Sequence, residues 1–408
     1  MSPVNDVPTL EDFRLQARAW LEAHAPPRRT ETTIWGVGSD SVAVFQDRDE
    51  QEEAAGVERA CAWHRLKLAD GWALFGWPER YGGRDLPSVY ERTFAAEEAQ
   101  FEVPVVPEPL IITLDLVPPT IERFGTTEQK ERFLPAFLST DLLCCQLFSE
   151  PNAGSDLASL ACRAERSEGR WIVNGQKVWT SGALQCDYGF LLARSDPSAP
   201  KHHGITAFLV PLDRPGVEIR PIRQLTGGAT FNEVFLSDVQ LTDDLRIGDE
   251  GAGWHVALTI LGFERSISGD GSAGIGGSWS QVRALSEHLG DTADPVIRQR
   301  LSSLYTRTRV LDMLNGRTRG RLAAGQQPGP EASLAKLLWS RTLTATSDVV
   351  AALLGPRLVA DTGEWGTYAW AEHVLGAPGY RIAGGSDEIQ LNIVAERVLG
   401  LPREPRVG

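Results

Sequence analysis

The sequence predicts an α+β fold in which two helical segments flank a central β-segment. Apolar residues recur at helical spacing from Leu10 to about Leu143, and short alternating segments typical of strands run from Cys144 to about Leu241. Helical spacing returns after Gly253. We therefore expect three domains, at residues 1–143, 144–243 and 244–408. A chain of 408 residues is long enough to form two or three separate cores.

Helix-end signals divide the first segment. Val117–Gly125 ends one helix at a glycine, and Thr126 with Gln129 can form the capping box of the next. The loop Gly76–Gly83 interrupts the helical pattern between the N-terminus and these two helices. We therefore expect several helices rather than one long one.

The central segment has the turn and strand signals of a small β-domain. Arg170–Trp179 contains the dipeptide Asn174-Gly175, which suits a type I′ turn, so we expect a hairpin there. Ile205–Pro211 and Asn232–Leu236 are expected as further strands, and Cys144 with Cys145 is expected to pack in another.

The last segment is expected to be helical to its end. Ser333–Leu354 carries leucines and valines at helical spacing, and Gly355-Pro356 would terminate that helix. Ser386 can cap a final helix. Gly269–Gly274 satisfies G-x-G-x-x-G, but a helix pattern precedes it and no strand follows, which argues against a dinucleotide site.

Composition excludes several classes of function. The net charge of −14, with no basic run, argues against nucleic acid as a partner. No apolar run approaches the roughly 18 residues of a membrane span, and the N-terminus lacks the apolar stretch of a signal peptide. The five cysteines are odd in number and have no C-x-x-C spacing, which indicates reduced thiols in the cytoplasm and no metal site.

Two motifs about twenty residues apart carry the functional information. Gln146–Asp156 contains S-E-P-x-A-G-S-D, and Asn174–Ser181 contains N-G-x-K-x-W-T-S. Together they resemble the flavin- and thioester-binding segment of the acyl-CoA dehydrogenase family, and Gly76–Gly83 resembles the family's W-P-x-x-Y-G-G turn. The resemblance covers nearly the whole chain. It implies an N-terminal helical domain, a middle β-barrel domain and a C-terminal four-helix bundle.

The resemblance also implies FAD as cofactor. Trp179 fits the position that stacks on the isoalloxazine ring, and Ser181 fits the hydroxyl that reaches N5. The alternative is that Trp179 is a core tryptophan of a small barrel. Lys177 is expected to be a surface charge rather than a ligand contact. The other residues that the resemblance assigns to FAD are Gln146, Phe148, Ser149, Ser386 and Glu388.

Removal of the substrate's α-proton requires a base, and the thioester carbonyl must accept hydrogen bonds. Most family members place a glutamate in a C-terminal segment where this chain has Gly384. A second arrangement in the family places the base on an earlier helix, and Glu264 fits it. The alternative is that Glu264 pairs with a neighbouring cation. Gly384 would still offer its backbone N–H to the thioester carbonyl.

Two residues are assigned to the acyl-CoA substrate. Ser155 lies in a turn that resembles the one facing the pantetheine or phosphate end, although a structural turn is the alternative. Arg265 follows the expected base. The small residues of Gly269–Gly277 either leave room for a wide acyl group or allow close helix packing.

Two departures from the family pattern concern the neighbouring subunit. Residues 287–295 lack the R-x-x-F-G motif, and Leu354–Arg357 replaces L-G-G-x-G; both motifs serve a neighbour's FAD. This pattern resembles one subunit of the actinobacterial heteromeric enzymes that act on steroid side-chain thioesters, in which a homologous partner completes a heterotetramer. The alternative is a homo-oligomer that uses Arg298 or Arg300.

The resemblance therefore implies FAD-dependent α,β-dehydrogenation of a bulky acyl-CoA to the trans-2-enoyl-CoA. Electrons would leave to an electron-transfer flavoprotein. Two alternatives stay open: a flavin monooxygenase-like relative, whose reduced flavin would react with oxygen, and a catalytically silent partner subunit.

Overall fold

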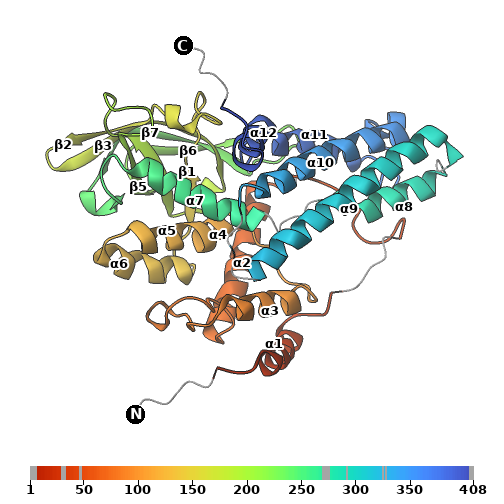
Figure 1. Ribbon diagram of the computed structural model, residues 1–408, viewed down its shortest axis with the longest axis horizontal. Coiled ribbons are helices and arrows are strands. Elements are labelled where there is room, and N and C mark those ends of the chain that lie inside the picture. The colour runs from red at the N-terminus through yellow and green to blue at the C-terminus, as the bar shows by residue number, and fades with distance from the viewer. Residues whose placement is uncertain are drawn as a thin grey trace. The chain divides into compact units, whose positions relative to one another are not determined.

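The computed structural model describes residues 7–28, 34–45, 48–268, 276–290, 293–323, 326 and 329–403 (Figure 1). The chain divides into two compact units. The first comprises Met1–Thr30, Arg48–Arg223 and Ala229–Leu261, and the second comprises Glu31–Asp47, Gln224–Gly228 and Gly262–Gly408. Within the described residues, no helix combines the length and apolar character needed to cross a membrane. The boundaries expected after residues 143 and 243 stay predictions.

The N-terminal helices of the first unit pack around an aromatic core. Phe13, Ala17 and Leu21 follow one another at four-residue spacing and are fully buried, so they form one apolar stripe. Phe13 contacts Tyr90 edge to face, with ring centroids 5.0 Å apart. The helices are α1 (Leu10–His24), α2 (Glu50–Ala69), α3 (Ser88–Glu98), α4 (Glu108–Ile111), α5 (Val117–Phe124) and α6 (Thr127–Leu138).

The expected helix ends in this part are present. Gly125 is the C-cap of α5, and Thr126 and Gln129 form the predicted capping box of α6. Between α4 and α5 the chain forms a π-helix, Ile112–Leu116, closed by a hydrogen bond from the Val117 N–H to the Ile112 carbonyl. The wider turn arises where Pro118 and Pro119 follow, since proline has no N–H to give to the preceding turn.

The β-segment forms one eight-stranded sheet. Its hydrogen-bonded order is β6-β7-β3-β2-β4-β5-β8, with β1 paired in parallel to β4. Cys144 and Cys145 lie in β1 and are fully buried, and Ile205–Pro211 forms β5, as predicted. The strands are β1 (Cys144–Leu147), β2 (Arg163–Ser167), β3 (Arg170–Ser181), β4 (Tyr188–Arg194), β5 (Ile205–Pro211), β6 (Val217–Ile222), β7 (Phe231–Leu241) and β8 (Arg246–Ile247).

The predicted Asn174-Gly175 hairpin is wrong. Arg170–Ser181 is one continuous strand, and the turn lies before it at Glu168 and Gly169, whose φ angles are 49° and 78°. Asn174-Gly175 instead marks a shift in the register between β3 and β7. A Cβ atom at Gly175 would lie 2.6 Å from the Cβ of Cys162, so glycine is required there for close packing rather than for a turn.

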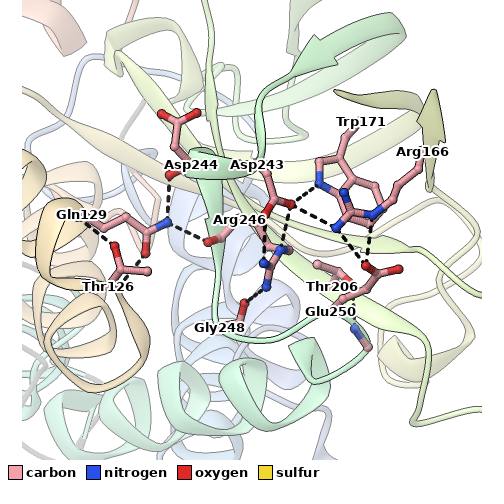
Figure 2. A network of polar contacts seen from close by, with 11 residues as sticks. Thr126, Gln129, Arg166, Trp171, Thr206, Asp243, Asp244, Arg246, Gly248 and Glu250 are labelled. Carbon is pink, nitrogen blue, oxygen red and sulfur yellow. Dashed lines mark hydrogen bonds and ion pairs between the residues drawn. The ribbon is translucent and has the colours of Figure 1, made fainter. Parts of the chain in front are cut away.

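A polar network connects helix α6 to the sheet (Figure 2). The Gln129 side-chain amide donates to the backbone carbonyls of Asp244 and Arg246, at 2.8 and 2.7 Å. Asp243 accepts hydrogen bonds from the Trp171 indole at 2.9 Å and from the Arg246 guanidinium at 3.0 Å. This network fixes the helical layer against the sheet within the first unit.

Replacing Asp243 by asparagine should lower the free energy of unfolding at neutral pH by roughly 1–2 kcal/mol. This loss is smaller than at a fully buried ion pair, because the Asp243 side chain is about half exposed and water screens its charge. The Arg246 guanidinium holds the pKa of Asp243 well below its usual range. Its stabilisation is therefore complete above the unfolded pKa of about 3.9 and is lost as the pH falls below it. Urea unfolding from neutral to acidic pH should show the gap between Asp243→Asn and the parent closing. Asp244→Asn, at a side chain 55% exposed, is the control and should change stability little.

The second unit is a helical bundle with its own core. Figure 1 shows α8, α9 and α10 running lengthwise beside one another, and Val282, Leu285 and Val350 are fully buried between them. Gly355 ends α10 and Ser386 caps α12, as predicted. The helices are α8 (Trp279–Leu289), α9 (Pro295–Ala323), α10 (Ala332–Leu354), α11 (Trp370–Gly376) and α12 (Asp387–Ile393), and α7 (Gly253–Ser268) continues into this unit from the first.

Candidate active site

Trp179 is the most unusual residue of the β-sheet. Its φ angle is 61°, in the left-handed region, and its side chain is 59% exposed. The register between β3 and β7 shifts between Lys177 and Thr180, so a β-bulge turns the indole outward. Such backbone strain in a bulky residue concentrates at functional sites. The alternative that Trp179 is a core tryptophan is wrong.

The other sheet residues expected to contact FAD lie on β1 and β3 and in the segment after β1. Phe148 is buried and Ser149 half-buried, and the Ser149 carbonyl accepts a hydrogen bond from the Val178 N–H at 2.9 Å. The Gln146 amide nitrogen is buried and has no hydrogen-bond partner among the residues that the structure describes. We call Gln146, Phe148, Ser149, Trp179 and Ser181 the β1–β3 region.

The β1–β3 region fits a flavin on two observations. A buried amide donor without a partner is rare in folded proteins, and an acceptor on a bound ring would satisfy Gln146. The exposed indole of Trp179 offers a flat aromatic surface of the kind that stacks on a planar ring. These residues could therefore hold FAD.

Lys177 is fully buried, so its expected place on the surface is wrong. Its ammonium donates to the Glu150 carboxylate at 2.7 Å and to the Phe148 carbonyl at 3.0 Å. Glu150 in turn accepts from the backbone N–H groups of Ala161 and Cys162, at 2.6 and 2.9 Å. This buried ion pair joins the two sequence motifs. The glutamate of the first motif and the lysine of the second were visible in the sequence, but their contact was not.

Ser181 ends β3 beside helix α4. The residue after Ser181 packs tightly against α4, since a Cβ atom at Gly182 would lie 2.2 Å from the Cγ of Pro109. The sequence did not indicate this contact, because the spacing of 73 residues between Pro109 and Gly182 gives no local signal.

In the second unit, the two expected catalytic positions come together. A Cβ atom at Gly384 would lie 4.0 Å from Oε1 of Glu264, whose side chain is half-buried on α7. The carboxylate at position 264 thus lies next to the point from which a side chain at position 384 would start. Ile260, one turn earlier on α7, is fully buried.

Hydrogen bonds fix the loop that carries Gly384. Gly384 and Gly385 have φ angles of 64° and 83°, which favour glycine. Lys336 donates to the Gly385 carbonyl at 2.7 Å, and the Gln390 amide donates to the Gly384 carbonyl at 3.0 Å. Buried Asp387 accepts from Ser340 at 2.7 Å and from Arg381 at 3.0 Å. The carbonyls are thereby occupied and the loop is rigid.

The remaining expected site residues are less informative. Ser155 is exposed in the turn after β1, and Glu388 is exposed on α12, whose N-cap Ser386 accepts from the Ile389 N–H at 3.4 Å. The Arg265 side chain and residues 269–275 lie outside the described residues. The roles of Ser155, Ser386, Glu388 and Arg265 therefore stay predictions.

Neither metal-binding clusters nor disulfides occur in the part of the chain that the structure describes. No group of three His, Cys, Asp or Glu side chains there could hold a metal ion, and Cys61, Cys144, Cys145, Cys162 and Cys186 are free thiols. Burial raises the pKa of Cys162 to about 11, so this thiol is protonated at neutral pH.

Replacing Trp179 by glycine should weaken FAD binding about 10- to 100-fold while leaving the stability of the apoprotein within about 1 kcal/mol. The exposed indole contributes little to the core, and glycine removes the strain of the left-handed φ angle. FAD titration followed by flavin fluorescence, with urea unfolding of the apoprotein, measures both quantities. Tyr368→Ala, at a side chain 44% exposed in the second unit, is the control and should leave FAD affinity unchanged. Equal FAD affinity in Trp179→Gly and the parent would remove the indole from the cofactor site.

Known protein families match the chain over most of its length. Residues 39–141, 145–239 and 251–399 match the N-terminal, middle and C-terminal domains of acyl-CoA dehydrogenase, respectively. The chain is 38% identical to acyl-CoA dehydrogenase IpdE1 of Mycobacterium tuberculosis, over 97% of this chain and 99% of that protein.

Two solved structures are similar over almost the entire chain. The Tcur3481-Tcur3483 steroid ACAD is 26% identical with a TM-score of 0.73, covering 97% of this chain and 98% of that chain. The ChsE4-ChsE5 complex from Mycobacterium tuberculosis is 26% identical with a TM-score of 0.70, covering 98% of this chain and 100% of that chain. Both are complexes of two differently named subunits. The predicted succession of helical, β and helical domains is confirmed.

Proposed function

Because this chain belongs to the acyl-CoA dehydrogenase family, whose members oxidise the CH–CH group of acyl-CoA thioesters, we propose that it binds FAD and converts a bulky acyl-CoA to its trans-2-enoyl-CoA. The observation that carries the proposal is the position of Glu264 beside Gly384. The Glu264 carboxylate thus lies beside position 384, where most family members carry the C-terminal glutamate and this chain carries glycine.

Glu264 acts as the general base. Its carboxylate takes the α-proton of the substrate, and the Gly384 N–H donates a hydrogen bond to the thioester carbonyl, whose negative charge grows as the proton leaves. The hydrogen bonds from Lys336 and Gln390 hold the Gly384 loop in one conformation, so its N–H needs no reorganisation during the reaction.

FAD supplies the acceptor of the β-hydride when it is bound. The β1–β3 region would hold its ring, with the Trp179 indole on one face, the Gln146 amide as a hydrogen-bond donor and the Ser181 hydroxyl at N5. Ser386 and Glu388, at the start of α12, are also proposed to contact FAD. Ser155 and Arg265 would contact the CoA thioester.

A homologous partner subunit would complete the enzyme. The solved structures named above are complexes, and this chain lacks the two motifs that serve a neighbour's FAD. The alternative clamp residues, Arg298 and Arg300, are exposed on α9. We propose a steroid-derived acyl group as the substrate class, electron-transfer flavoprotein as the electron acceptor, and the cytoplasm as the location.

Purification of the chain alone and together with a homologous partner tests the proposal. A flavin absorbance spectrum and titration with steroid side-chain CoA thioesters should show bound FAD that bleaches without oxygen. Rapid reaction of reduced flavin with oxygen, and no bleaching by any acyl-CoA, would favour a monooxygenase-like activity. Bleaching that occurs only at the partner's flavin, with full activity after Glu264→Gln, would identify this chain as a silent subunit.

A further inference from the structure

Residues 34–45, here called the strap, belong to the second unit, although helices α1 and α2 of the first unit precede and follow them in the sequence. Val42, Ala43 and Val44 of the strap are buried, and Val42 and Val44 lie in cores of the second unit. The Ala43 carbonyl accepts a hydrogen bond from the Gly276 N–H at 2.9 Å, shortly before α8. The strap is therefore packed and hydrogen-bonded into the helical bundle.

The last residue of the strap forms a stacked pair of aromatic rings. Phe45 lies nearly parallel to Tyr380, with ring centroids 4.8 Å apart and an angle of 8° between the ring planes. Tyr380 also contacts Trp339 of α10, with ring centroids 4.5 Å apart. A Cβ atom at Gly379 would lie 2.7 Å from Cε2 of Phe45, so glycine lets the ring reach the backbone of the 3₁₀-helix Ala377–Arg381. Phe45 thus packs on both a side chain and the main chain of this helix.

This 3₁₀-helix leads directly into the loop that carries Gly384. The Gly379 carbonyl accepts hydrogen bonds from the N–H groups of Ile382 and Ala383, at 3.1 and 2.9 Å. Ala383 immediately precedes Gly384 in the sequence. The backbone against which Phe45 packs is therefore hydrogen-bonded to the residue before the N–H that would serve the thioester.

The hydrogen bonds of Lys336 and Gln390 act on the part of the loop after Gly384. They bind the carbonyls of Gly385 and Gly384, which lie in the two peptide planes that follow Gly384. The Gly384 N–H lies in the peptide plane before it, which it shares with the Ala383 carbonyl. Because glycine allows a wide range of backbone angles, this earlier plane needs an anchor of its own. The preceding turn supplies that anchor.

We propose that Phe45 is a positioning residue for the thioester, because its ring packs on Tyr380 and Gly379 and so holds the turn that fixes the direction of the Gly384 N–H. The inference rests on the proposed function, since it takes this N–H as the donor to the thioester carbonyl. The negative charge on that carbonyl grows as the α-proton leaves, so an aligned donor binds the transition state more strongly than the substrate. Loss of alignment therefore slows the reaction more than it weakens substrate binding.

Replacing Phe45 by leucine should slow reduction of the bound flavin at saturating acyl-CoA by about tenfold, the upper end of the effect of one aromatic pair. The dissociation constant of acyl-CoA should change little, because the N–H is aligned chiefly for the transition state. Tyr380→Leu should give a similar loss. The double variant should be no slower than the slower single variant, since both remove one contact. Stopped-flow absorbance measures rate and affinity, on variants that are saturated with FAD and keep the circular dichroism of the parent.

Trp35→Leu is the matched control, because it removes a ring stack from the other end of the same strap. Trp35 stacks on His288 of α8, with ring centroids 4.1 Å apart and an angle of 15° between the ring planes. This contact holds the strap on the bundle but does not involve the turn before Gly384. The variant should therefore lower the stability of the apoprotein to urea and keep the parent rate of flavin reduction. If Trp35→Leu slows reduction as much as Phe45→Leu, general attachment of the strap explains the effect and the proposal is wrong.

A conservative variant shows whether the stacked ring itself is responsible. Tyr380→Phe keeps the ring and removes only the hydroxyl, so it should keep the parent rate. A loss as large as in Tyr380→Leu would assign the effect to the hydroxyl and contradict the proposal.

Reduction of the parent protein separates failure of the proposed function from failure of the inference. If the parent binds no FAD, or no acyl-CoA reduces it, the proposed function fails and the inference with it. If the parent is reduced and Phe45→Leu keeps the parent rate, only the inference is wrong.

Discussion

Replacing Glu264 by glutamine is expected to slow reduction of the bound flavin by acyl-CoA by about 100- to 10,000-fold, the usual contribution of a general base. Glutamine keeps the shape of the side chain but cannot take the α-proton. The Gly384 loop is held by Lys336 and Gln390, so it should be undisturbed. Stopped-flow absorbance of the flavin measures the rate, and FAD content and substrate affinity should match the parent.

Glu287→Gln is the matched control for this substitution. Glu287 is exposed on α8 and pairs with Arg283 at 2.7 Å, so its loss should leave the rate unchanged. Retention of more than about a tenth of the parent rate in Glu264→Gln would exclude Glu264 as the base.

The proximity of Glu264 and Gly384 also allows a rescue experiment. Adding Gly384→Glu to Glu264→Gln places a carboxylate where its Cβ starts 4.0 Å from Oε1 of the original residue. The left-handed φ of 64° should cost roughly 1–2 kcal/mol for a residue with a Cβ, so we expect partial rather than full recovery. Recovery would show that both positions reach the same substrate proton.

Local signals in the sequence predicted local structure well. The capping box of Thr126 and Gln129 is confirmed because it depends on residues three apart. The cap at Ser386 is confirmed for the same reason. The Asn174-Gly175 turn was wrong because packing against Cys162, distant in the sequence, requires the glycine. Packing against Cys162, and not the local preference of Asn-Gly for a turn, therefore determined the backbone conformation at Gly175.

The candidate site was only partly predictable. The motifs identified Trp179, and the missing C-terminal glutamate directed attention to Glu264. The sequence could not show that Glu264 lies beside Gly384, because these residues are 120 positions apart. Lys177 shows the same limit, since lysine is almost never fully buried unless it is paired, and the sequence did not show its partner Glu150.

Replacing Lys177 by methionine should lower the free energy of unfolding by about 3–5 kcal/mol, because it leaves the Glu150 carboxylate buried without its cation. Glu150 would keep only the N–H groups of Ala161 and Cys162. The contact between Lys177 and the Phe148 carbonyl is also lost, so the segment after β1 should become less ordered. Urea unfolding followed by circular dichroism measures the change.

Lys201→Met is the matched control, since Lys201 pairs with Asp156 at 2.6 Å but both side chains are largely exposed. A pair in water contributes about 0–1 kcal/mol, so the difference between the two lysine variants isolates the effect of burial. Adding Glu150→Gln to Lys177→Met removes the uncompensated charge and should recover part of the loss. If Lys177→Met costs no more than Lys201→Met, the buried pair does not hold the two motifs together. If the double variant is stable but binds FAD weakly, the pair serves mainly to order the β1–β3 region.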